Sequence, residues 1–155
     1  MAIPGEDIGK TSVEVRKLLD AILINQVELY RKTKHFYDTN GAHSFLVHNR
    51  SFSDQFNELN ESINEVRSRI CKLGYRCEEP FTVSDELLDA RHEKPSFRLI
   101  KDLLEDHEAL IGNLQHSAAR CKIQNNDIET ADLLNGLLKK HELVAWTLRK
   151  YLNQL

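Results

Sequence analysis

Histidines and carboxylates are the side chains of this sequence best suited to hold a metal ion, so their spacing limits its chemistry. The chain has 7 histidines and 24 acidic residues. A di-iron centre inside a helical bundle needs a Glu-x-x-His pair on each of two helices, because two cations require bridging carboxylates and terminal imidazoles. No Glu-x-x-His occurs anywhere in the sequence. The spacing therefore argues against a di-iron oxidase built within one chain.

Two histidines, His107 and His141, lie on the apolar faces of predicted helices. Neither has a carboxylate at three-residue spacing on the same face. We therefore expect them to be hydrogen-bonded core histidines, the alternative being metal ligands.

The three cysteines, Cys71, Cys77 and Cys121, have spacings that fit neither a disulfide framework nor a zinc site. We expect them to be reduced thiols that are partly buried. The sequence also lacks a glycine-rich phosphate loop, a nucleophile elbow and a Cys-x-x-Cys pair. The familiar enzyme motifs are therefore absent.

The elements that must position these side chains are helices, to judge from the composition. With 155 residues and 41% hydrophobic content, the chain can fill one core, and only 3 Pro and 6 Gly leave little turn chemistry for a many-stranded sheet. The longest apolar runs, such as 21–24 and 143–146, are far shorter than the roughly 20 residues of a membrane-spanning helix. The first residues lack the pattern of a secretory signal, so we expect a cytoplasmic protein with no membrane association.

Apolar residues at helical spacing predict four long helices. A capping box formed by Thr11 and Glu14 is expected to start the first helix, and Gly74 is expected to end the second. The expected elements are a flexible tail at 1–11, long helices at about 12–38, 44–73, 96–120 and 127–153, and a short helix at 84–92. Two short connections and one long one predict a single all-α domain over residues 1–155, a ferritin-like four-helix bundle with an extra short helix in its crossover connection.

One flank of the second predicted helix is polar but uncharged. Its residues recur at helical spacing: Asn49, Ser53, Asn57, Asn60, Asn64 and Ser68. Solvated helix faces usually carry Glu and Lys, and Asn and Ser have poor helix propensity. We hypothesise that this flank is a subunit interface held by neutral hydrogen bonds, the alternative being a solvated face.

Three segments carry a resemblance to a known family: LYRKTKHFYDTNGAHSF at 29–45, LIKDLLEDHEALI at 99–111 and DIETADLLNGLLKKHELVAWTLRKYL at 127–152. In these segments the chain resembles the Dps family of mini-ferritins. The resemblance implies a hollow dodecameric shell that oxidises ferrous iron with hydrogen peroxide, stores the mineral and shields DNA.

The resemblance also implies a ferroxidase centre between subunits, with histidines from one chain and carboxylates from the other. The equivalent positions in this sequence hold Tyr37, Asn49, Ser53, Asn64 and Ser68. Neutral amide and hydroxyl oxygens are poor ligands for an iron dication, so we expect no catalytic residues and a degenerate centre. The alternative is a relocated metal site that uses His35 or His48 with Glu61 or Glu65.

Two further features of the family concern the entry of cations and the binding of DNA. Asp127, Glu129 and Asp132 match the acidic segment that lines a three-fold pore in the family, where three copies would attract cations. Acids at a helix N-terminus also satisfy the helix dipole, and both roles can hold together. The tail before Thr11 has Lys10 as its only lysine, and the net charge is −3, so DNA binding through a basic tail is unsupported.

The sequence therefore favours a subunit of a homo-oligomeric shell for iron sequestration and stress protection, with iron as its cargo and the ferroxidase centre inactive. One alternative is an active peroxide-linked ferroxidase with a relocated site. Another is a non-catalytic scaffold shell that binds DNA or a protein partner. Assembly with a catalytically intact paralogue is a further hypothesis.

Overall fold

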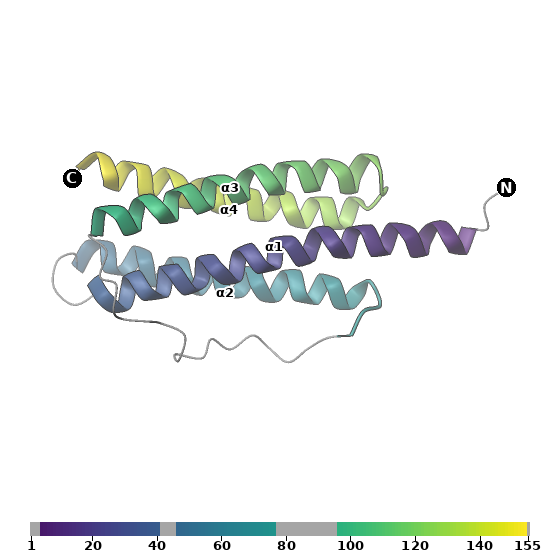
Figure 1. Ribbon diagram of the computed structural model, residues 1–155, viewed down its shortest axis with the longest axis horizontal. Coiled ribbons are helices and arrows are strands. Elements are labelled where there is room, and N and C mark those ends of the chain that lie inside the picture. The colour runs from purple at the N-terminus through teal and green to yellow at the C-terminus, as the bar shows by residue number, and fades with distance from the viewer. Residues whose placement is uncertain (1–3, 41–45, 77–95, 155) are drawn as a thin grey trace.

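The computed structural model describes residues 4–40, 46–76 and 96–154, with side chains placed for 11–36, 55, 57–76 and 97–153. The described residues form four helices, α1 (Pro4–Asn40), α2 (Leu46–Lys72), α3 (Ser96–Ile123) and α4 (Ile128–Gln154). They make two antiparallel hairpins, α1 with α2 and α3 with α4, laid against each other (Figure 1). Because α2 ends and α3 begins at opposite ends of the bundle, these two helices run in the same direction. This is the crossover topology that the long connection predicts.

The first helix begins earlier than the sequence predicts. It starts at Pro4 instead of near Thr11, so the predicted flexible tail at 1–11 is wrong for residues 4–10. Proline is favoured in the first helical turn, where its missing N–H has no intrahelical partner to lose, and the acidic Glu6 and Asp7 suit the positive end of the helix dipole. The predicted short helix at 84–92 lies outside the described residues.

The core is the shared apolar face of all four helices. Each helix supplies a residue about every three to four positions, because that spacing returns to the same face of a helix with 3.6 residues per turn. The largest fully buried apolar side chains are Leu19, Ile22, Leu29, Ile63, Ile100, Leu110, Leu114, Leu134, Leu137 and Leu148. Burying such a side chain contributes roughly 1.5–3 kcal/mol, so the bundle rests mainly on this layer. No helix within the described ranges is long and apolar enough to cross a membrane.

Two residues with positive φ end helices at the same end of the bundle. Gly74 follows α2 with φ of 94°, which confirms its predicted role as a helix stop. Asn126 in the α3–α4 turn has φ of 51°, a conformation that asparagine tolerates better than most residues. Beside that turn, Asn125 Nδ2 donates a 2.8 Å hydrogen bond to Glu14 Oε2 of α1. The α3–α4 turn is thereby fastened to the first helix.

Candidate functional site on the flank of α2 and α4

A surface groove of about 630 Å³ runs between α2 and α4. Asn64 and Ser68, two of the residues at the ferroxidase positions of the resembled family, line its α2 side, and both are exposed. Glu61 and Glu65 lie beside them on α2, and Glu129 comes from α4. The groove therefore gathers two of the neutral positions, both carboxylates of the predicted relocated site and one predicted pore acid.

The position of the groove follows from the helical period of α2. Leu59, Ile63, Val66 and Ile70 are buried against the other helices. At 100° per residue, Asn64 and Ser68 lie on the opposite side of α2 from this apolar stripe. Within the single chain, the described part of the polar flank is therefore at the surface.

The remaining predicted ligands are only partly described. Tyr37 lies in α1, and Asn49, Ser53 and His48 lie in α2, but their side chains are outside the described residues. His35 is half-buried on α1. Glu65 Oε1 forms an ion pair with Lys140 Nζ at a distance of 3.4 Å. Among the described side chains, no group of three histidines, cysteines or acids comes together in a way that could hold a metal ion.

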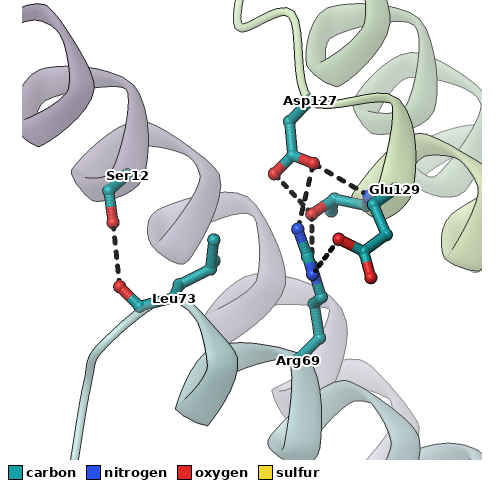
Figure 2. A network of polar contacts seen from close by, with 6 residues as sticks. Ser12, Arg69, Leu73, Asp127 and Glu129 are labelled. Atoms are coloured by element: carbon teal, nitrogen blue, oxygen red, sulfur yellow. Dashed lines mark hydrogen bonds and ion pairs between the residues drawn. The ribbon is translucent and has the colours of Figure 1, made fainter.

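A polar network joins the end of α2 to the start of α4 (Figure 2). Arg69 Nε donates to Thr130 Oγ1 at 2.8 Å, and its Nη2 donates to Asp127 Oδ1 at 3.1 Å. Its Nη1 forms an ion pair with Glu129 Oε2 at 2.9 Å. The side chains of Arg69 and Asp127 are 12% and 14% exposed, whereas that of Glu129 is 74% exposed. The pair with Asp127 is therefore better shielded from solvent than the pair with Glu129.

Asp127 also caps α4. Its Oδ1 accepts the backbone N–H of Thr130 at 3.0 Å, and its Oδ2 accepts the Thr130 hydroxyl at 2.6 Å. These contacts satisfy a backbone donor that has no partner within the helix. Two of the three predicted pore acids, Asp127 and Glu129, thus point at Arg69 within their own chain, while Asp132 is exposed one turn further along α4. The sequence could not predict this arrangement, because Arg69 and Asp127 are far apart in the chain and only packing brings them together.

A second polar contact lies inside the core. His107 of α3 and His141 of α4 are 1% and 2% exposed, and their Nδ1 atoms are 2.9 Å apart, so one ring donates its Nδ1–H to the other. Burial, with a smaller contribution from His141, lowers the pKa of His107 to about 3. Burial and the nearby charge of Lys140 lower the pKa of His141 to about 4. The prediction of hydrogen-bonded core histidines is confirmed, and both rings are neutral at pH 7.

The cysteines differ from the prediction of three reduced thiols. Cys71, in the last turn of α2, is disulfide-bonded, so the prediction is wrong for this residue. Cys121 is free and buried, and burial followed by the charge of Asp127 raises the pKa of its thiol to about 11. Cys77 lies outside the described residues. Three cysteines can form one disulfide bond and leave one free thiol, and their spacing alone does not exclude this.

Sequence comparison identifies the family. Residues 16–155 match the ferritin-like domain family. The chain is 30% identical to an uncharacterised low temperature-induced protein of Nostoc sp., over 97% of this chain and 88% of the relative. It is 28% identical to DNA protection during starvation protein 2 of Bacillus anthracis, over 77% of this chain and 82% of the relative.

Solved structures show the same fold. The Dps protein of Vibrio cholerae O1, described as a member of a broad superfamily of ferritin-like diiron-carboxylate proteins, has a TM-score of 0.76 at 19% identity, covering 92% of this chain and 91% of that one. A Dps mutant of Listeria innocua has a TM-score of 0.74 at 20% identity, covering 90% of this chain and 95% of that one. The chain therefore belongs to the ferritin-like domain family and has the four-helix fold of its Dps members.

Proposed function

We propose that this protein is a Dps-like subunit of a hollow shell of identical chains, a dodecamer as the resemblance implies, which sequesters iron under stress without oxidising it at the two-fold centre. The observation that carries the proposal is the chemistry of the α2 flank. Asn64 and Ser68 supply a neutral amide and a neutral hydroxyl where the family uses carboxylates, and neither balances the charge of an iron dication.

The wider surroundings support an inactive centre. Glu65 is paired with Lys140, and Glu129 is paired with Arg69, so two of the three carboxylates that line the groove already have cationic partners. A carboxylate held by a cation is a weaker ligand, because a metal ion must displace that partner. The stress role is supported by the names of two relatives, one low temperature-induced and the other a DNA protection protein.

The proposal is tested by anaerobic titration of the purified full chain with Fe²⁺, followed by hydrogen peroxide, with ferric product measured by absorbance. We expect ferric product at the rate of a protein-free blank. Saturable Fe²⁺ binding followed by oxidation several times faster than the blank would overturn the proposal.

A gain-of-function variant sharpens the test. The substitutions Asn64→Asp and Ser68→Glu together reintroduce two carboxylates on the groove, and we expect this variant to bind Fe²⁺ more tightly than the wild type. The control pair Asn57→Asp and Asn60→Glu adds the same charge to α2 nearer its N-terminus. Equal binding by both variants would show that added charge, and not its position, attracts iron.

The alternative of an active ferroxidase with a relocated site draws on one observation, the presence of Glu61 and Glu65 in the same groove as Asn64. If this alternative is correct, Glu61→Gln and Glu65→Gln will each abolish a fast oxidation that the wild type shows. A scaffold shell that binds DNA is the other candidate, and the name of the Bacillus anthracis relative favours it. Retardation of duplex DNA in a gel at low salt, lost at 0.3 M NaCl, would support it.

A further inference from the structure

The C-terminal part of α4 carries the only tryptophan of the chain on its outward side. Trp146 is 57% exposed, although so large an apolar ring is highly buried in most proteins. It lines a surface groove of about 530 Å³ together with Arg149, Lys150 and Asn153. All three lie within about 60° of Trp146 around the helix axis, so the four residues share one side of α4. An indole, two cations and an amide therefore stand together at the surface of the single chain.

The two cations of this groove are held in different ways. Lys150 Nζ lies over the ring of Trp146, 5.1 Å from the ring centroid. Such a contact is weak at an exposed position, so Lys150 can leave the ring for an anion. Arg149 donates from Nε and Nη2 to Glu108 Oε1 of α3 at 3.1 and 3.0 Å. Its Nη1 has no partner among the described residues and is available to a ligand.

Charge alone does not select a ligand for the groove. Glu108 offsets Arg149, Glu142 is exposed one turn before Trp146, and the carboxyl end of α4 bears partial negative charge. A simple inorganic anion would therefore meet a nearly balanced field. A purely apolar ligand would bury little of its surface, because the indole is open to solvent. A ligand that gains from both kinds of group needs a flat ring with an anionic group a few bonds away.

We propose that this groove binds a nucleotide, either free or within a single strand, with its base stacked on the indole of Trp146 and its phosphate paired with Lys150 and Arg149. Stacking on an aromatic side chain suits every base, because each base has a π-face. Asn153 adds an amide to the groove, and adenine is the base with which an asparagine amide forms two hydrogen bonds. Adenine is therefore the expected base. The proposal goes beyond the iron-sequestering shell and does not depend on it.

A free nucleotide or a single strand suits the groove better than duplex DNA. Within a duplex each base is stacked on its neighbours, so an indole reaches a base only after costly unstacking. A duplex would have to bind through its phosphates alone. For that purpose this face of α4 offers Lys139, Arg149 and Lys150 against Glu108 and Glu142, which is a small excess of positive charge.

The test uses the full-length protein and the fluorescence of Trp146, which reports on this groove because the chain has no other tryptophan. The probe is adenosine 5′-monophosphate (AMP), compared with adenosine, which lacks the phosphate, and ribose 5-phosphate, which lacks the base. We expect saturable quenching by AMP at low salt and binding weaker by about fivefold or more for each truncated ligand. An oligo(dA) single strand that binds more tightly than AMP would identify a strand as the source of the nucleotide. AMP that binds as tightly as the strand would identify the free nucleotide.

Variants separate the roles of the ring and the cation. Lys150→Gln should weaken AMP binding by about threefold or more without weakening adenosine binding. Lys101→Gln, at an exposed position on α3, is the matched control and should change neither. Isothermal titration calorimetry should detect no AMP binding to Trp146→Leu and should detect most of it in Trp146→Phe, which keeps an aromatic ring. Far-ultraviolet circular dichroism checks that every variant folds.

Several results would overturn the nucleotide site. Equal binding of ribose 5-phosphate and AMP would show that charge alone holds the ligand, and undiminished AMP binding by Trp146→Leu would place the site elsewhere. An acidic peptide that displaces AMP at equal concentration would identify a protein partner instead. Trp146 emission that acrylamide fails to quench in the purified wild type would show that another chain covers the groove. None of these results bears on the iron titration, so the two proposals fail independently.

Discussion

Asp127 of the Arg69 network has a structural role that Glu129 lacks. Asp127 caps α4 and forms the shielded pair with Arg69, whereas the Glu129 side chain is mostly exposed. We expect Asp127→Ala to lower the free energy of unfolding by about 1–3 kcal/mol, because the cap is lost and Arg69 loses its shielded ion-pair partner. Glu129→Ala should cost less than about 0.5 kcal/mol. Urea denaturation of both variants measures the difference, and equal losses would contradict the assignment.

The side chain of Gln26 on α1 is fully buried, and neither its amide nitrogen nor its oxygen has a hydrogen-bond partner among the described residues. A buried amide without partners is costly, so we expect Gln26→Leu to raise the free energy of unfolding by about 1–2 kcal/mol. Gln115→Leu, at an exposed position on α3, is the matched control and should change it little. Destabilisation by Gln26→Leu would instead indicate an ordered water that satisfies the amide.

At the scale of the helices, the contact between α3 and α4 should weaken in acid. The His107–His141 pair has pKa values of about 3 and about 4 in the folded chain, against an ordinary value of 6.5. The unfolded chain therefore takes up protons first as the pH falls. The contribution of the pair is complete above pH 6.5 and is lost as the pH falls from there towards 4 and 3.

The corresponding prediction concerns the slope of stability with pH. Two such groups contribute up to about 2.7 kcal/mol per pH unit between pH 6 and 4, and His107→Gln should remove about half of this slope. Urea denaturation at a series of pH values measures it. His116→Gln, at an exposed position on α3, is the control and should leave the slope nearly unchanged.

The elements also show how far sequence reasoning reaches. The periodicity of apolar residues was sufficient to predict the four helices and the two histidines in their core, because the residues on the buried side of a helix recur at helical spacing in the sequence. It failed at the first helix, where the capping box at Thr11 and Glu14 outweighed the helix-starting proline at Pro4. It also could not find the Arg69 network, because the contact joins residues that only the packing of α2 against α4 brings together.

At the scale of the whole molecule, the bundle buries one apolar face of each helix and leaves a polar flank of α2 facing outward. The groove between α2 and α4 therefore lies at the surface of the single chain, and two of the three carboxylates that line it are paired with cations.

The division into two hairpins has a consequence for synthesis of the chain on the ribosome. The α1–α2 hairpin emerges first, and its apolar face is covered only when α3 and α4 pack against it (Figure 1). About half of the chain follows α2. At a synthesis rate of roughly 5–20 residues per second, the apolar face of the hairpin therefore stays uncovered for roughly 4–16 s. The nascent protein therefore passes through an interval in which a chaperone that binds apolar helices would have a ready substrate.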